Sequence, residues 1–355
     1  MSLKQALQVI RLLGLPKAVR TKRRLDEALP YVRGYAVCSS IWALLETGTL
    51  DRLLEAESIS VEALVEEGGL QRHVLDSLFS YLDGLSFVRV EGNEVRALPK
   101  LRRLMAEPRG FFELTYAYEP IFDRLRDLLQ GNAAYPDDVE RIGKYVGRGS
   151  GQLCLALPYP VLADMLRRHG AHLVLDLGCG DLAFLLYLCE AIPRIRAVGI
   201  DIDGPTVVYA REVLAEVRTR SGAAVPFGDR IEVHEADMFD LDAIAAAHPD
   251  IDAITAVDTY HEYLAEGEEV VVGLLKKLRS EFPKALLYVG EFCKQPHDKL
   301  RRNPTAFLEH HLFHDLTNQT IVDANAWRTM FAAADLEVIE EKVFDIVGHG
   351  YFVLR

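Results

Sequence analysis

The chain of 355 residues has fewer basic than acidic side chains, and this imbalance excludes several kinds of partner. Its 40 lysines and arginines are outnumbered by 53 aspartates and glutamates, which gives a net charge of −13. A surface this acidic does not attract nucleic acid or an anionic membrane. We therefore expect neither of these as a partner, and we expect a small molecule as the substrate.

Cysteine is also scarce, and no long apolar run occurs near the start of the chain. The cysteines are odd in number, lie mostly within apolar runs and lack the paired spacing of a metal site: Cys38, Cys154, Cys179, Cys189 and Cys293. Reduced thiols in a core are the expected state, as in cytoplasmic proteins. The first residues have helical periodicity with interspersed Lys and Arg, without the apolar core of a signal peptide or a membrane span. We predict a cytoplasmic protein.

The most informative segment that is present covers residues 173–181, Leu-Val-Leu-Asp-Leu-Gly-Cys-Gly-Asp. An apolar run ends there in Asp176, Gly178 and Gly180, and a helical pattern follows from Leu182. This order predicts a strand, a tight turn and a helix. Glycines in such a turn allow a ligand to lie against bare backbone, where a side chain would collide with it.

A second apolar run, residues 197–200, ends in Asp201, 21 residues after Gly180. A carboxylate at the tip of a strand can accept both hydroxyls of a ribose, so Asp201 and the adjacent Ile202 are expected to bind a nucleoside. The glycine spacing alone also fits a dinucleotide. However, the carboxylate of Asp176 would repel a pyrophosphate, whereas it suits a ligand with an ammonium beside a sulfonium. S-adenosylmethionine has such an end.

Residues 231–238 predict a third strand that ends in Asp237, whose carboxylate could accept from an adenine amino group, with Met238 against the ring. Acids thus accompany the ends of three consecutive strands. The arrangement resembles the class I S-adenosylmethionine-dependent methyltransferases over roughly residues 165 to 355. This resemblance implies an α/β fold with a Rossmann-like, seven-stranded sheet that is completed by an antiparallel C-terminal hairpin.

Residues 31–105 form a separate compositional unit. Helical patterns precede a small hairpin of residues 87–90 and 95–98, which is the order of a winged helix. The helix in the DNA-reading place, residues 71–82, has only Arg72 and His73 as cations, so DNA binding is not expected. The unit resembles the N-terminal dimerisation domain of small-molecule O-methyltransferases. That resemblance implies a homodimer in which one subunit helps to close the other's active site.

These patterns predict three parts: a winged-helix-like dimerisation domain (1–105), a helical connector that contributes to the active site (106–165) and a cofactor-binding catalytic domain (166–355). The connector contains a glycine-rich break, residues 143–151, with Tyr145 and Arg148 as candidate substrate contacts. A guanidinium in such a break can hold a carboxylate through two parallel hydrogen bonds. A surface loop with an idle arginine is the alternative.

A fourth strand, residues 253–257, leads into Asp258 and the segment His261-Glu262-Tyr263. Ligands of open α/β sheets lie beyond the carboxyl ends of the strands, so His261 is expected beside the methyl donor. In the O-methyltransferases that the chain resembles, a histidine in a His-Asp-Trp segment deprotonates a phenol. In this chain His261 matches the position of that base, but Glu262 and Tyr263 stand where those enzymes have Asp and Trp.

A fifth strand, residues 285–289, precedes a long insertion with three more histidines, His310, His311 and His314. With His261 and the glycine-rich break, residues 312–319 resemble the 2-oxo acid C-methyltransferases, which include the 2-ketoarginine and phenylpyruvate enzymes. The resemblance implies that His261 and His314 hold one transition-metal ion, such as iron or zinc, with His310 and His311 as alternative ligands. A helix-surface or capping role for the three histidines is the other interpretation.

Such an enzyme methylates C3 of a 2-oxo acid through an enolate, whose charge a chelating metal would stabilise. Asp258 or Glu262 is a candidate acceptor of the C3 proton. We favour 2-ketoarginine (5-guanidino-2-oxopentanoate), en route to a β-methyl amino acid in natural-product biosynthesis. Its guanidinium would suit acids in the connector or near the insertion, namely Glu113, Glu119, Glu291 and Glu309. The alternative function is a small-molecule O-methyltransferase with His261 as general base.

Overall fold

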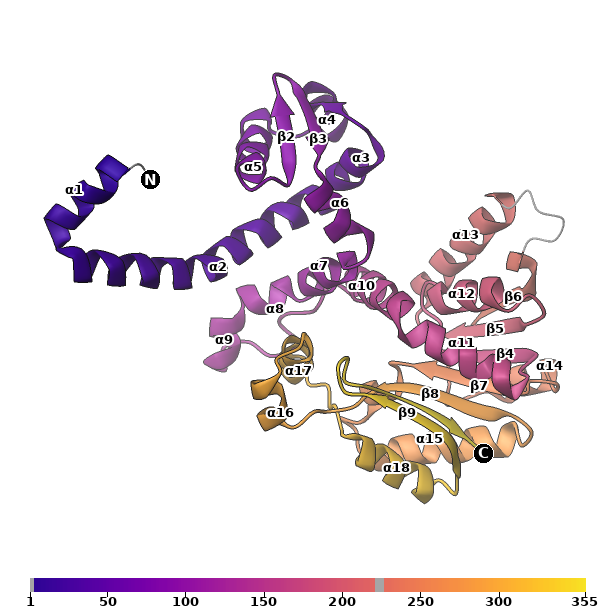
Figure 1. The fold of residues 1–355 in the computed structure, drawn as a ribbon. Helices are drawn as coiled ribbons and strands as arrows, with labels where there is room; N and C mark the ends of the chain where they lie inside the picture. The colour runs from indigo at the N-terminus through magenta and orange to yellow at the C-terminus, as the bar shows by residue number, and fades with distance from the viewer. Residues whose placement is uncertain (1–2, 221–226) are drawn as a thin grey trace. The chain divides into compact units, whose positions relative to one another are not determined.

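The computed structural model describes residues 3–220 and 227–355. The chain divides into two compact units, Met1–Phe112 and Glu113–Arg355 (Figure 1). Among the described helices, none combines the length and the apolar character needed to cross a membrane.

The first unit begins with α1 (Leu3–Leu13) and the 32-residue α2 (Leu15–Glu46). Three shorter helices follow, α3 (Thr49–Glu55), α4 (Val61–Gly68) and α5 (Arg72–Gly84). The strands β1 (Ile59–Ser60), β2 (Val88–Glu91) and β3 (Glu94–Ala97) form an antiparallel sheet in the order β1-β3-β2, and α6 (Pro99–Ala106) comes next. The predicted order of helices followed by a hairpin is therefore present.

The connector is helical, as predicted, but its glycine-rich stretch is part of a helix rather than a loop. The helices are α7 (Arg109–Ala117), α8 (Glu119–Asp123), α9 (Leu125–Leu129), α10 (Gly143–Ala156) and α11 (Pro158–His169). At one glycine α10 packs closely against its neighbour: a Cβ on Gly151 would lie 3.4 Å from the Cβ of Ala183 in the adjacent helix, whereas a Cβ on Gly143 or Gly147 would meet no atom within 4 Å. Burial against a neighbour thus outweighs the poor helix propensity of glycine.

The second unit is built on a seven-stranded sheet, which confirms the predicted α/β methyltransferase fold. Its strand order is β6-β5-β4-β7-β8-β10-β9. The strands from β6 to β8 are parallel, and β10 is antiparallel to both β8 and β9. Their bounds are β4 (Leu173–Leu177), β5 (Arg196–Asp201), β6 (Ile231–Glu235), β7 (Ala253–Val257), β8 (Leu286–Phe292), β9 (Val338–Phe344) and β10 (His349–Leu354).

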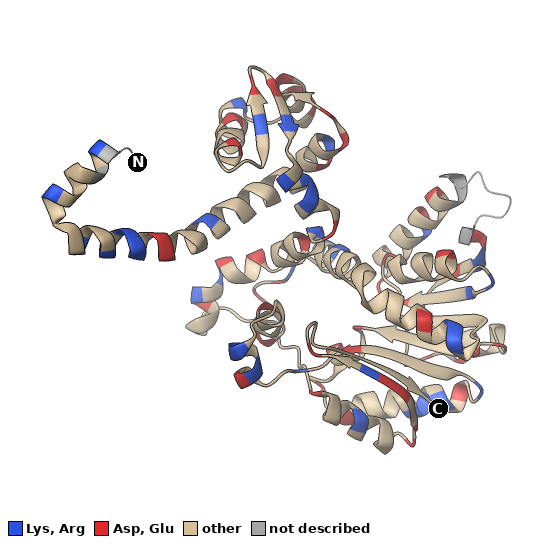
Figure 2. Cartoon of the chain, in the orientation of Figure 1, with Lys and Arg blue, Asp and Glu red and all other residues tan. Residues whose placement is uncertain are grey.

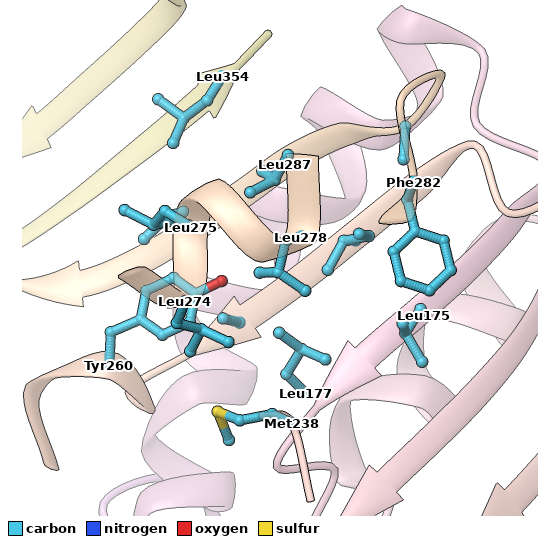
Figure 3. Close-up of a cluster of buried hydrophobic side chains, with 14 of the residues drawn as sticks. Leu175, Leu177, Met238, Tyr260, Leu274, Leu275, Leu278, Phe282, Leu287 and Leu354 are labelled. Carbon is cyan, nitrogen blue, oxygen red and sulfur yellow. The ribbon is translucent and has the colours of Figure 1, made fainter. Parts of the chain in front are cut away.

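Helices cover both faces of this sheet (Figure 1). One face carries α11, α12 (Ala183–Ala191) and α13 (Gly204–Arg220), and the other carries α14 (Asp242–Ala247), α15 (Glu268–Glu281) and α18 (Ala324–Ala333). Side chains alternate along β4, so Leu175 and Leu177 pack with Leu274 and Leu278 of α15 (Figure 3), while Val174 joins the core on the opposite face. The remaining short helices are η1 (Phe227–Arg230), η2 (Tyr260–Tyr263), α16 (His297–Arg302) and α17 (Phe307–Leu316).

Three boundaries differ from the sequence prediction. Strand β6 ends at Glu235, so Asp237 lies in the turn after the strand. Strand β8 continues through Phe292, which places Glu291 inside the sheet instead of in a loop beyond it. The sequence pattern predicts a last strand from Tyr351 to Leu354, but β10 begins at His349, because this residue already pairs with both neighbouring strands.

Candidate active site

A cavity of about 200 Å³ lies in the second unit beyond the carboxyl ends of β4 and β7. Its lining comes from four parts of the chain: the connector, the turn after β4, the segment after β7, and α17 with the end of β8. These parts include Tyr118, Arg141, Gly178, Gly180, Asp181, Asp258, His261, Glu262, Phe292, His310 and His314. The cavity therefore contains the predicted catalytic residues and both predicted metal ligands.

The glycine turn after β4 has the conformation that its sequence predicts. Gly178 and Gly180 have φ angles of +70° and +53°, which residues with a side chain rarely adopt. A Cβ on Gly178 would lie 3.2 Å from Thr259, whereas a Cβ on Gly180 would meet no atom within 4 Å. The backbone at Gly180 thus borders open space in which a ligand can lie.

Asp176, at the end of β4, is buried beneath this turn. Thr255 donates a hydrogen bond of 2.6 Å from Oγ1 to Oδ1 of Asp176. Burial raises the pKa of Asp176 to about 7, against the opposing hydrogen bond from Thr255 and with a smaller contribution from the charge of Asp201. A nearby cation would favour the charged form of this carboxyl group.

Asp201 joins the end of β5 to the glycine turn. Its Oδ2 accepts from the backbone N–H of Gly180 and its Oδ1 from that of Asp203, both at 3.0 Å. The adjacent Ile202 has 63% of its surface exposed. These positions at the sheet edge suit the predicted nucleoside contacts, although neither Asp201 nor Ile202 is among the residues that line the cavity.

The third predicted cofactor segment differs more from expectation. Asp237 is exposed and its Oδ1 accepts from the backbone N–H of Phe239 at 2.9 Å. Met238 is buried among core side chains and lies beside Leu177 (Figure 3). Little of the Met238 side chain is therefore left to contact an adenine ring, because the sheet already covers it.

His261 is held by a buried carboxylate that sequence reasoning assigned to another role. Glu291 of β8 is fully buried, and its Oε2 accepts from Nδ1 of His261 at 2.9 Å. Its Oε1 accepts from the backbone N–H of Thr259 at 2.9 Å and of Tyr260 at 2.5 Å. Glu291 thus fixes both η2 and the His261 ring, so it is not the tail-binding acid that the sequence suggested. The available signal was a single acid within an otherwise apolar strand.

These contacts determine the protonation of His261. Burial lowers its pKa, but the charge and hydrogen bond of Glu291, together with Glu262 and Asp258, raise the pKa above its ordinary value. Because Nδ1 carries the proton that Glu291 accepts, Nε2 is the ring nitrogen with a free lone pair when His261 is neutral.

His310 and His314 lie one helical turn apart on α17 and both line the cavity, whereas His311 does not. The ring centres of His261 and His314 are 5.1 Å apart. Nδ1 of His314 donates to the carbonyl oxygen of His310 at 2.8 Å. Burial, followed by the charge of His261, lowers the pKa of His314 to about 4, and burial lowers that of His310 well below its ordinary value. Both rings are neutral at pH 7.

Arg141, which no sequence pattern singled out, supplies a cation to the cavity wall. Its guanidinium donates to Oε1 of Glu262 at 3.1 Å and to Oε1 of Gln319 at 3.0 Å. Burial opposes its charge, but Glu262 and Tyr118 raise the pKa of Arg141 above its ordinary value. The ring of Tyr118 stacks on Phe313 of α17 with 4.5 Å between centres. The connector and the insertion therefore meet at the cavity.

The predicted substrate contacts in the glycine-rich stretch lie elsewhere. Arg148 donates from Nη2 to Oε1 of the buried Glu113 at 2.9 Å. Tyr145 is buried and packs edge to face with Tyr116, with 5.0 Å between ring centres. Neither Tyr145 nor Arg148 is among the residues that line the cavity. Their predicted contact with the substrate gains no support from these positions, because α10 presents its small residues there instead.

The two candidate proton acceptors are both paired. Asp258 accepts from Nε2 of His349 at 2.6 Å and from Sγ of Cys154 at 3.5 Å. Burial raises its pKa, but His349 and His261 hold the pKa below its ordinary value. The pKa of Glu262 is likewise lowered, because Arg141 and His261 outweigh its burial. Both carboxylates are ionised at pH 7.

The acids proposed for a guanidinium tail do not reach the cavity. Glu113 and Glu291 are buried and paired, and Glu119 and Glu309 are exposed. None of these four lines the cavity; among the described residues, the acids that do so are Asp181, Asp258 and Glu262.

The chain is similar in sequence to known methyltransferases. No protein-family model matches the chain. The chain is 28% identical over 329 residues to the 2-ketoarginine methyltransferase of Streptomyces arginensis, with 91% of each chain covered. It is 24% identical over 258 residues to methyltransferase ungE' of Aspergillus campestris, with 69% of each covered.

Several solved structures share the fold. The structure called LaPhzM has a TM-score of 0.65 and 16% identity, covering 93% of this chain and 98% of that one. Mitomycin 7-O-methyltransferase MmcR has a TM-score of 0.63 and 15% identity, covering 96% and 99%. At this level of identity the likeness shows the fold alone.

Proposed function

We propose that this chain, a class I S-adenosylmethionine-dependent methyltransferase of the O-methyltransferase-like family, methylates C3 of a 2-oxo acid. The observation that carries the proposal is the pair of His261 and His314 at the cavity, each with Nδ1 already engaged by another protein group. The similarity to a 2-ketoarginine methyltransferase supports the same reaction class.

The two imidazoles fit a transition-metal ion such as iron or zinc. Ligating histidines usually donate their second ring N–H to a carboxylate or a backbone carbonyl, as His261 does to Glu291 and His314 does to His310. Nε2 of each ring would be the ligand atom, and His310 is the alternative to His314. When bound, such an ion would supply Lewis-acid stabilisation of the enolate charge.

The chain's own residues would position the substrate. Arg141 is a fork of donors at the cavity wall and would hold the substrate carboxylate, which we now assign to it instead of Arg148. The ionised Asp258 and Glu262 are the candidate acceptors of the C3 proton. Asp181 would suit the guanidinium of 2-ketoarginine, our proposed substrate, whereas Tyr118 and Phe292 would suit an aryl tail.

Product analysis tests the reaction class. The enzyme is supplied with isotopically labelled S-adenosylmethionine and, in turn, 2-ketoarginine, phenylpyruvate and a catechol. We expect the transferred methyl to resonate as a methyl on carbon with 2-ketoarginine, and turnover to stop when a chelator is added. A methyl on oxygen, formed equally well in the presence of the chelator, would contradict the proposal.

The second candidate function is O-methylation of a small molecule with His261 as general base. The specific observation in its favour is the contact between Glu291 and His261, since a buried carboxylate that raises the pKa of a histidine strengthens it as a base. This function needs no contribution from His314, and this difference separates the two candidates.

Cofactor binding is expected to depend on the glycine turn and on Asp201. Replacing Asp201 by Ala removes a proposed ribose contact worth roughly 1.5 to 3 kcal/mol, which corresponds to a loss of affinity of about tenfold or more. Gly180→Val fills the open space beside the turn and strains its φ of +53°. Calorimetry with S-adenosylmethionine measures both effects. Unchanged affinity in both variants would mean that the cofactor lies elsewhere.

The raised pKa of Asp176 predicts that cofactor affinity depends on pH. Between pH 6 and 7.5 the group loses its proton, and the charged form attracts the ammonium of the cofactor. Affinity should therefore rise with pH, by up to about tenfold per unit below the pKa. Asp176→Asn should bind more weakly with little dependence on pH over this range. Calorimetric titrations at several pH values measure the affinity of both proteins. An equal dependence of affinity on pH in the parent and in Asp176→Asn would refute the role of Asp176.

We also propose a homodimer formed through the first unit. α1 and α2 expose large apolar side chains, among them Leu12, Leu25, Tyr31, Val32 and Tyr35. Lys and Arg outnumber Asp and Glu along these helices (Figure 2), whereas the whole chain is acidic, so a second copy offers a surface of complementary charge. In this proposal residues 1–105 form the dimer, residues 106–165 contribute to the active site and residues 166–355 bind the cofactor.

Light scattering tests the dimer. The full chain at micromolar concentration should have twice the mass of one chain, because exposed apolar area of this extent is seldom left uncovered. Introduction of two negative charges into this apolar surface, with Leu25→Glu and Val32→Glu together, should give a monomer. A monomeric parent chain would remove the idea that one subunit completes the other's pocket.

A further inference from the structure

A second group of metal-binding side chains lies at the edge of the sheet, on residues that do not line the cavity. Glu232 and His234 are two residues apart in β6, an outer strand of the sheet, and therefore share one face of it. His248 follows the last residue of α14, which packs on that face. One atom from each of these three side chains lies within 4.8 Å of the other two.

The distances suit an ion between the three groups better than hydrogen bonds among them. Oε2 of Glu232 is 3.8 Å from Nε2 of His234 and 3.7 Å from Nε2 of His248. These separations are too long for hydrogen bonds. Ligand atoms about 2.1 Å from a tetrahedral zinc ion lie about 3.4 Å from one another. Small side-chain rotations would bring the three atoms to that spacing.

The surroundings favour a ligand in this place. Nε2 of His234 is buried and has no hydrogen-bond partner among the described residues, a condition that costs free energy unless another group satisfies the nitrogen. Arg196 approaches the other oxygen of Glu232, with Nη2 3.8 Å from Oε1, so Oε2 remains directed at the histidines. The His248 side chain is only 12% exposed, which limits its freedom to turn away.

We propose that Glu232, His234 and His248 form a binding site for one zinc-like divalent ion. Two imidazoles and one carboxylate select zinc, cobalt or nickel over magnesium and calcium, which prefer oxygen ligands. The ligands flank residues 235–247, so a bound ion ties both ends of the segment that contains Asp237 and α14. This site is independent of the metal proposed for the active site.

Zinc titration of variants tests the proposal. The protein is prepared without a polyhistidine tag, stripped of metal, and carries His314→Ala so that the proposed active-site pair is broken. This variant should bind about one Zn²⁺ per chain in calorimetry. Adding His234→Ala should weaken binding by at least about 100-fold, since even an outer-sphere partner contributes 10- to 100-fold. Adding His172→Ala, which removes a largely exposed histidine outside the group, should leave binding unchanged.

Thermal unfolding provides the second measurement. Zn²⁺ should raise the melting temperature of the His314→Ala protein and of its His172→Ala derivative, but not of its His234→Ala derivative, because only the site in the folded state binds the ion. Absence of zinc binding by His314→Ala, or equal binding with and without His234, would overturn the proposal. Neither result bears on the active site, where the wild type and the His234→Ala single variant should have the same activity in the methylation assay.

Discussion

Alanine in place of His314 should reduce methyl transfer to a 2-oxo acid by about a thousandfold or more. The change would remove a ligand whose loss withdraws several kcal/mol of charge stabilisation from the enolate, and about 4 kcal/mol corresponds to a thousandfold in rate. Elemental analysis of the variant should show that the active-site ion is lost. The His314 side chain hydrogen-bonds the backbone carbonyl of His310 and packs against the rings of Phe292 and His310, so the fold should persist without it and circular dichroism should be unchanged.

His311→Ala is the matched control for this experiment. His311 is buried on the same helix, three residues earlier, but it packs against Phe307 and does not line the cavity. Its loss should leave turnover and active-site metal nearly as in the parent. If His314→Ala instead keeps most of its activity while His261→Ala loses it, the general-base O-methyltransferase mechanism explains the site and the metal proposal fails.

Replacing Glu291 by Gln should reduce active-site metal affinity or turnover by about 10- to 100-fold. Glutamine keeps the size of the side chain and can still accept from Thr259 and Tyr260, but it lacks the charge that holds the His261 ring. Burial, now unopposed by that charge, should lower the pKa of His261. Glu309→Gln, a change at an exposed acid, is the control and should have no effect.

The same substitution should alter stability in a pH-dependent way. The folded-state pKa of His261 is raised, so the stability from its pairing with Glu291 is full below the unfolded pKa of about 6.5 and is lost as pH rises through the folded value. The difference in melting temperature between the parent and Glu291→Gln should therefore shrink from pH 6 to pH 9. A constant difference over this range would show that His261 is not the group that Glu291 stabilises in its charged form.

The sheet and the glycine turn could be predicted because their signals are local. An apolar run followed by Gly178 and Gly180 specifies a strand and a turn within nine residues, and β7 has the predicted bounds. The acids that follow the strands can be predicted in the same way, since each of them comes at the end of an apolar run. Prediction from sequence succeeds where neighbours along the chain decide the conformation.

The roles of Glu291 and Arg141 could not be predicted because their partners are distant in sequence. Glu291 is 30 residues from His261, and Arg141 is 121 residues from Glu262. The prediction of a loop for residues 143–151 was wrong for a related reason. Glycine has a low helix propensity, but this segment packs against α12 and is helical. The burial of Met238 likewise could not be predicted, because the core residues that cover it are distant in sequence.

The contacts between the connector and the insertion make substrate choice a property of two segments at once. Arg141 binds Gln319, Asn318 donates from Nδ2 to the carbonyl oxygen of Tyr135 at 3.0 Å, and Tyr118 stacks on Phe313. A chimera that receives only one of these segments from a relative would combine surfaces that were never matched to each other. Exchange of substrate preference between relatives should therefore require residues 113–157 and 297–319 to be transplanted together, while the sheet that carries the cofactor site stays in place.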